Sequence, residues 1–197
     1  MILYNILIVG VGGQGAVTFG NFFQDYALQD PRIKDFVATE SRGVSQREGS
    51  VYSLIRYILE EPKEQATKKK KKIPAIAPVI PKGKVDLFIA LEPLEFLRYL
   101  DFLSPMCLCI VNTRKLIPKS IITNKNIKYP DIEASLQKIH QTYPKLKIIA
   151  EDFTSQIEEL NSPMFMVNKQ ILQGLINQSH DFFDNSILKS LIQSYFL

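Results

Sequence analysis

A strand, a glycine turn and a helix follow one another near the start of the chain, and this order constrains the fold more than any other feature. Residues 5–28 are "NILIVGVGGQGAVTFGNFFQDYAL". The apolar run at residues 6–9 predicts a buried parallel strand, and the apolar spacing after Gly15 predicts an amphipathic helix. A strand that leads through glycines into a helix N-terminus commonly holds a nucleotide phosphate.

The glycines of this turn fit two different structures. Gly10, Gly12 and Gly15 match G-x-G-x-x-G, in which glycine permits a tight turn and close approach of a phosphate. A dinucleotide site also needs an acidic residue about 20 residues further on, and Glu40 lies 25 positions after Gly15. No P-loop lysine follows Gly15. The motif alone is therefore compatible with an NAD or FAD site, or with a turn that packs the first helix tightly on the sheet.

The rest of the chain alternates between predicted strands and helices. Further strands are predicted at residues 35–40, 51–59, 85–92, 107–113 and 145–152, and helices at 93–100, 132–143, 162–176 and 187–195. Only a short polar loop separates the second strand from the third, whereas a parallel pair needs a crossover of a dozen or more residues. We therefore expect that pair to be antiparallel and the sheet to be mixed. The pattern predicts a single three-layer α/β/α Rossmann-like domain over residues 1–197, with a charged insertion at about residues 60–73.

Charge and cysteine content exclude several classes of protein. Five consecutive lysines, residues 68–72, exceed the whole formal net charge of +4, and such a run predicts a solvated loop tip rather than a nucleic-acid-binding face. Cys107 and Cys109 alternate on a predicted strand and are expected to be small buried residues, so we predict no metal or iron–sulfur site in this chain. No apolar run could span a bilayer and no signal peptide is evident, so no membrane association and a cytoplasmic location are expected.

Several segments together resemble a known family. "NILIVGVGGQG", "ESRGVSQREGSV", "APVIPKGKVDLFIALEPLEFLRYL" and "CIVNT" are similar, in order and spacing, to the gamma-type subunit of 2-oxoacid:ferredoxin oxidoreductases. Within that group they look most like the small (beta) subunit of indolepyruvate ferredoxin oxidoreductases. The C-terminal "SPMFMVNKQILQGLI" resembles a helix of the family, with Asn168 and Gly174 in the matching places. The resemblance covers nearly the whole chain.

The resemblance implies a reaction that is shared between chains. A 2-oxoacid, here indolepyruvate or another aryl pyruvate, is decarboxylated on thiamine diphosphate, electrons pass through iron–sulfur clusters to ferredoxin, and the acyl group leaves on coenzyme A. This chain has neither the cysteines for clusters nor the "GDG" pattern that holds thiamine diphosphate through a divalent metal. The resemblance therefore implies a subunit that binds no cofactor alone. A larger partner would carry thiamine diphosphate, Mg and the 4Fe-4S clusters, and the glycine turn would not be an NAD site. An isolated preparation is expected to form homodimers.

Two segments supply the candidate site residues, although no residue qualifies as a catalytic base or nucleophile. The N–H groups of the glycine turn are suited to a phosphate of coenzyme A or of the partner's cofactor. The loop at residues 40–50 carries arginines suited to carboxylates and phosphates, or alternatively to acidic residues of the partner. Glu92 ends a strand at the same edge, either at a ligand site or as an acid on a helix dipole. The candidate cofactor-binding residues are Gly10, Gly12, Gly13, Gln14, Gly15, Arg42, Ser45, Gln46, Arg47, Ser50 and Glu92.

Two departures from the family pattern keep alternatives open. Glu48 stands where the family loop usually has glycine, which puts the substrate or anion contact in doubt. The lysine-rich segment at residues 63–72 is longer and more basic than expected, which concerns a surface loop. The alternatives to the oxidoreductase subunit are a stand-alone NAD- or FAD-binding protein and a regulatory homologue without the reaction.

Overall fold

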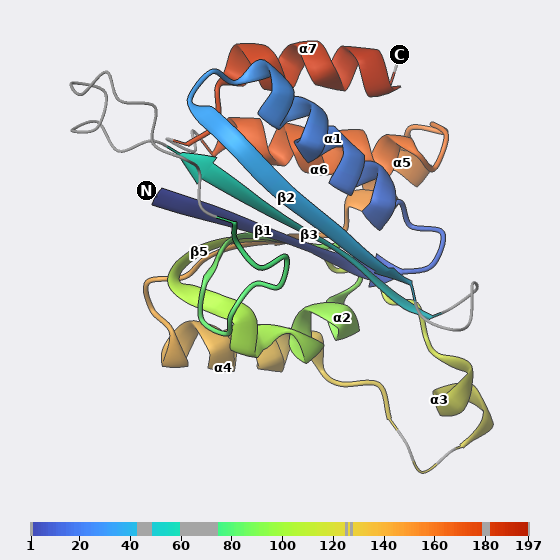
Figure 1. Ribbon diagram of the computed structural model, residues 1–197. Coiled ribbons are helices and arrows are strands. Elements are labelled where there is room, and N and C mark those ends of the chain that lie inside the picture. Colours follow the sequence, from blue (N-terminus) through green and yellow to red (C-terminus); the bar gives the residue numbers. More distant parts are fainter. Residues whose placement is uncertain are drawn as a thin grey trace, which may run out of the picture.

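The computed structural model describes residues 2–42, 49–59, 75–124, 126, 128–178 and 182–196. Within them a single six-stranded sheet, in the order β2-β3-β1-β4-β5-β6, lies between two layers of helices (Figure 1). The strands are β1 (Ile2–Val11), β2 (Ile33–Arg42), β3 (Ser50–Leu59), β4 (Val85–Ala90), β5 (Leu103–Asn112) and β6 (Lys147–Glu151). The helices are α1 (Ala16–Gln29), α2 (Pro93–Arg98), α3 (Lys119–Thr123), α4 (Ile132–Thr142), α5 (Phe153–Glu159), α6 (Met166–Asn177) and α7 (Asn185–Phe196), with a 3-10 turn at Leu100–Phe102.

The sheet is mixed, as the short loop after the second strand predicted. β3 runs antiparallel to both of its neighbours, β1 and β2, whereas β1–β4, β4–β5 and β5–β6 are parallel pairs. The β1–β3 register runs from Ile2 opposite Leu59 to Val11 opposite Ser50, so the end of β1 and the start of β3 lie side by side. The glycine turn and the polar loop therefore leave the sheet at the same edge.

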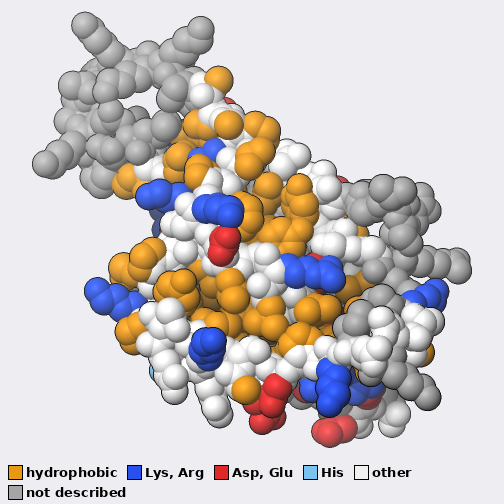
Figure 2. All heavy atoms as spheres, turned by 90° about the horizontal axis from the view of Figure 1, so that it is seen from below, with side chains coloured by type: hydrophobic (Ala, Val, Ile, Leu, Met, Phe, Trp, Pro, Cys, Tyr) orange, Lys and Arg blue, Asp and Glu red, His pale blue; other side chains and the backbone are white. Residues whose placement is uncertain are grey.

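Helices cover both faces of the sheet, which explains why β1 is apolar without alternation. α1, α5, α6 and α7 lie on one face, and α2 and α4 lie on the other (Figure 1). The first layer buries the aromatic side chains Phe19, Phe22, Phe23 and Tyr26 of α1 against β1 and β3. On the face of α2 and α4, hydrophobic side chains gather across the middle, with charged groups scattered around them (Figure 2).

Some boundaries differ from the sequence prediction. α5 was not predicted because seven residues are too few to show a helical period, and α6 begins at Met166 rather than at 162 because residues 163–166 form turns. The cysteines are buried as predicted: Cys107 and Cys109 are both 0% exposed in β5, and burial raises the pKa of the Cys107 thiol. The lysine run and the insertion at 60–73 lie outside the described residues. Within the described part of the chain, every helix is too short or too polar to cross a membrane.

Candidate functional site

The glycine turn lies where the sheet changes its direction of winding. β1 is followed by α1 on one face, and its parallel neighbour β4 is followed by α2 on the other face. Open α/β sheets bind ligands at such a point, beyond the carboxyl ends of the strands. The candidate site is therefore the space beyond Val11 of β1 and Ala90 of β4.

Gln14 joins these two strand ends. Its side-chain Oε1 accepts a hydrogen bond from the Val11 N–H (2.7 Å), and its Nε2 donates to the Leu91 carbonyl (3.0 Å). A Cβ on Gly10 would lie 3.0 Å from both Gln14 Oε1 and Leu91 Cβ, so the close packing favours glycine there. The sequence predicted that Gln14 binds a cofactor. In the structure its side chain makes the two hydrogen bonds above, which hold the turn in place.

Gly15 brings the start of α1 against α6. Its φ of 91° lies in the left-handed region, and a Cβ at this position would lie 2.3 Å from the side-chain nitrogen of Asn168. Asn168 is only 7% exposed, yet its side-chain amide makes no hydrogen bond within the part of the chain that the structure describes. Among the described residues no side chain caps α1, and its first turn holds no acidic residue. The positive end of a 14-residue helix and an unpaired amide therefore meet at one point.

A cavity of about 560 Å³ opens beside this point. Gly13, Gly15 and Asn168 line one side of it. Leu116, Met164 and Phe165 also line the cavity and are 42%, 57% and 56% exposed, so its mouth is apolar. The cavity thus combines helix N–H groups at one end with hydrophobic contacts at the other.

Buried polar groups form the floor of the cavity. Asn112, at the end of β5, donates to Thr154 Oγ1 (2.9 Å) and to the Leu91 carbonyl (3.4 Å). Arg114 lies on the wall, where it bonds Glu158 Oε1 (3.2 Å). Sequence reasoning did not name these residues as site candidates. A polar residue at the end of a buried strand, such as Asn112, is the one signal that could have indicated them.

The predicted polar loop ends beside the turn. Gly12 N–H donates to the Gly49 carbonyl (2.9 Å). Ser50 Oγ donates to Glu95 Oε2 (2.7 Å), a carboxylate that also accepts from Arg98 (2.6 Å), and burial raises the pKa of Glu95. Only the backbone of Arg42 is described. Ser45, Gln46, Arg47 and Glu48 lie outside the described residues.

Glu92 is 1% exposed, and both of its carboxylate oxygens accept hydrogen bonds from the protein itself. Oε2 accepts from the backbone N–H groups of Leu94 (2.7 Å) and Glu95 (3.0 Å), which caps α2. Oε1 accepts from Leu116 N–H (3.3 Å) and from the Tyr129 hydroxyl. Burial, with the Glu92 carboxylate next, raises the pKa of Tyr129. These contacts match the alternative in which Glu92 is an acid at the helix N-terminus.

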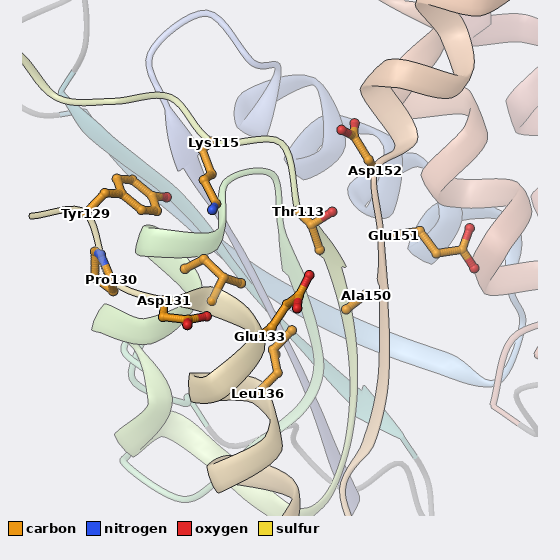
Figure 3. Close-up of a pocket in the computed structure, with 11 residues that line it drawn as sticks. Thr113, Lys115, Tyr129, Pro130, Asp131, Glu133, Leu136, Ala150, Glu151 and Asp152 are labelled. Carbon is orange, nitrogen blue, oxygen red and sulfur yellow. The ribbon is translucent and has the colours of Figure 1, made fainter.

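A second cavity, of about 680 Å³, lies beyond the ends of β5 and β6 (Figure 3). Four carboxylates line it together with Lys115, but two of them already cap helices. Asp131 accepts from Ala134 N–H (3.1 Å) and Asp152 accepts from Ser155 N–H (2.8 Å). No cluster of metal-binding side chains occurs among the described residues. This cavity is therefore a less specific candidate than the one beside the glycine turn.

The sheet order argues against a dinucleotide site. In that site the acidic residue ends the strand next to β1, but β3 lies between β1 and β2 here, so Glu40 is two strands away from the turn, about 10 Å across the sheet. The fold and site thus define a Rossmann-like α/β domain whose sheet order does not fit dinucleotide binding at the glycine turn.

Comparison with known proteins identifies the family. The model of the pyruvate ferredoxin/flavodoxin oxidoreductase family matches residues 5–197, so the chain belongs to that family. It is 37% identical over 142 residues (72% of this chain) to "Indolepyruvate oxidoreductase subunit IorB" of Archaeoglobus fulgidus. It is 32% identical over 154 residues (76% of this chain) to the protein of the same name from Thermococcus kodakarensis.

The matched regions cover only 62% and 61% of these two relatives. Among solved structures, the 2-oxoglutarate:ferredoxin oxidoreductase of Magnetococcus marinus, described with 2-oxoglutarate, coenzyme A and succinyl-CoA bound, aligns with 100% of this chain and 30% of its own. The TM-score is 0.53 at 11% identity, which supports a shared α/β fold.

Proposed function

We propose that this chain is the small, cofactor-free subunit of a cytoplasmic 2-oxoacid:ferredoxin oxidoreductase that acts on indolepyruvate or another aryl pyruvate. The observation that carries the proposal is the 37% identity to a protein named as an indolepyruvate oxidoreductase subunit. In this proposal a larger partner carries thiamine diphosphate, Mg and the 4Fe-4S clusters. Coenzyme A receives the acyl group and ferredoxin receives the electrons.

The chain's own residues favour placing the cofactors on the partner. A 4Fe-4S cluster uses four cysteine ligands, whereas this sequence has two cysteines, both buried in β5. Thiamine diphosphate supplies the electron sink for decarboxylation when it is bound. The part left to this chain is to bind, orient and exclude water around a reaction on the partner.

Within that role, we assign the cavity beside the glycine turn to an anionic group. The N-terminus of α1 favours negative charge, and the side-chain amide of Asn168, a residue that is 7% exposed, provides a donor next to it. A phosphate of coenzyme A or of the partner's thiamine diphosphate has the matching chemistry. The loop of residues 40–50 ends beside the turn at Gly49, and we propose that its Arg42 and Arg47 contact the same anion or acidic residues of the partner.

Anaerobic purification of the tagged chain from its host tests the subunit assignment. The proposal predicts a co-purifying chain that contains thiamine and iron, and ferredoxin reduction that depends on coenzyme A and on a 2-oxoacid. The acid with the highest kcat/KM identifies the substrate. A chain that purifies alone and binds NAD or FAD tightly would contradict the proposal. A complex that contains the partner but reduces no ferredoxin would favour the regulatory alternative.

Replacing Asn168 with aspartate tests the anion site. A carboxylate at this position repels phosphate, so Asn168→Asp is expected to raise KM for coenzyme A, or to lower thiamine diphosphate occupancy, by about 10-fold or more. Which of the two changes identifies the anion. Asn177→Asp makes the same chemical change at an exposed position of α6 and is the matched control. If both variants have the same KM for coenzyme A and the same thiamine diphosphate occupancy, the proposal that this cavity binds a phosphate is wrong.

A further inference from the structure

The connection between β5 and α4 is unusually long, and its middle part projects from the body. We call residues 113–130 the basic arm. Its described residues include the short helix α3, and Figure 1 shows α3 away from the sheet and from the other helices. Connections of this length inside compact domains usually have a function.

The sequence of the basic arm combines positive charge with aliphatic side chains. It contains five lysines and arginines and no aspartate or glutamate. Ile117 and Ile122 are 54% and 67% exposed, and Lys119 and Lys128 are exposed close to them in the sequence. Arg114, at its base, is paired with Glu158. Exposed aliphatic groups with a border of cations are typical of a protein interface rather than of a solvated loop.

Both ends of the arm are fixed to one buried carboxylate oxygen. Glu92 Oε1 accepts from Leu116 N–H (3.3 Å) near the start of the arm and from the Tyr129 hydroxyl near its end. The Lys115 ammonium lies 5.8 Å from the centre of the Tyr129 ring, and Figure 3 shows these two side chains at the base of the arm. A base held in this way reduces the conformational entropy that a binding event removes.

We propose that the basic arm is a docking element for an acidic surface of another protein chain. Resting on the proposed function, that chain is the larger, thiamine-carrying subunit. Lysines at the border steer an acidic partner and speed association, while buried isoleucines supply affinity. Leu116 and Arg114 belong both to the arm and to the wall of the cavity beside the glycine turn, so the docked chain lies next to the cavity mouth.

Two other occupants fit the arm less well. Single-stranded nucleic acid requires aromatic side chains for base stacking, and the one aromatic residue of the arm, Tyr129, has its hydroxyl bound to Glu92. An amphipathic helix on a membrane surface buries a continuous apolar face, whereas α3 has five residues and is too short to present one. A protein surface needs neither feature.

Binding of the purified larger subunit to arm variants tests the proposal. Ile117→Asp with Ile122→Asp is expected to raise the Kd by about 30-fold or more. The control is Leu28→Asp with Met106→Asp, which changes two still more exposed apolar residues (75% and 81%) outside the arm and is expected to leave the Kd within about 3-fold. Circular dichroism checks that all variants fold. Equal weakening by both pairs, or by neither, would overturn the proposal.

A charge-reversal variant tests whether the partner surface is acidic. Lys119→Glu with Lys128→Glu is expected to lower the association rate about 10-fold at low salt and less at 0.5 M salt. An unchanged rate would contradict an acidic partner surface. If the tagged chain recovers a thiamine-containing partner and the arm variants bind it normally, only the docking proposal fails.

If no such partner exists, the proposed function fails. Docking by the arm is then tested separately, by zero-length cross-linking of lysine to carboxylate in host extract. Cross-links to one chain identified by mass spectrometry, lost in Ile117→Asp with Ile122→Asp and kept in the control, would support docking to an acidic surface of that chain. Their absence, or binding to anionic vesicles or to oligonucleotides instead, would overturn the proposal.

Discussion

Replacing Gly15 with alanine places a methyl group where the structure has no room for one. The φ of 91° is in the left-handed region, which costs a residue with a Cβ about 1–2 kcal/mol. The new Cβ would also lie 2.3 Å from Asn168 Nδ2, and overpacking of a buried site costs about 1–3 kcal/mol. Gly15→Ala is therefore expected to lower the free energy of unfolding by about 2–5 kcal/mol.

A double-mutant cycle separates the two causes. In an Asn168→Ala background the clash is gone and only the backbone strain remains, so Gly15→Ala is expected to cost about 1–2 kcal/mol there. Urea unfolding of the wild-type chain, the two single variants and the double variant, followed by circular dichroism, gives the coupling energy. We expect at least about 1 kcal/mol of coupling. Strictly additive costs would refute the reasoning, since Asn168 would then be free to turn away.

Three further substitutions follow from the buried polar groups. Glu92→Gln places an amide N–H₂ against existing donors, so unfolding should become about 1–3 kcal/mol easier and amide hydrogens of the basic arm should exchange faster by mass spectrometry. For Glu95→Gln, the free energy of unfolding relative to that of wild type should increase as pH rises above 4.5, the ordinary pKa of this carboxyl. The folded-state pKa of Glu95 is raised, so the native state loses stability as pH rises through that range. Arg56→Met removes hydrogen bonds to Asn5 (3.0 Å) and to the Ala77 carbonyl (2.6 Å) and should cost about 2–4 kcal/mol in urea unfolding.

Each of these outcomes has a result that would contradict it. Unchanged exchange in Glu92→Gln would mean that the carboxylate does not hold the arm. A pH dependence that is the same in Glu95→Gln and wild type would place the titration elsewhere. For Arg56, the exposed Arg98→Met is the control, because its partner Glu95 keeps the hydrogen bond from Ser50; equal losses in the two variants would mean that burial adds nothing.

The periodic elements could be predicted from the sequence. An uninterrupted apolar run predicted that β1 is covered on both faces, and the loop without a helix predicted the antiparallel β2–β3 pair. Proline after Glu92 predicted the start of α2, and Asp131 predicted the cap of α4. These features depend on neighbours in the sequence, which a single chain displays directly.

The composition of the cavity could not be predicted in the same way. Gly15 precedes α1, Asn112 ends β5 and Asn168 lies in α6, and only the sheet order and the packing of α6 bring them together. Gln14 and Glu92 were predicted to bind a ligand because of their position at the strand ends. Sequence position does not show that their side chains already bond the backbone.

The central claim is that this chain is a required subunit of a 2-oxoacid oxidoreductase. Its most direct test is ferredoxin reduction by the purified larger subunit under anaerobic conditions, with and without this chain, in the presence of indolepyruvate and coenzyme A. The account predicts a reaction that saturates at a fixed molar ratio of this chain and is lost without it. Equal rates with and without the chain would contradict the account.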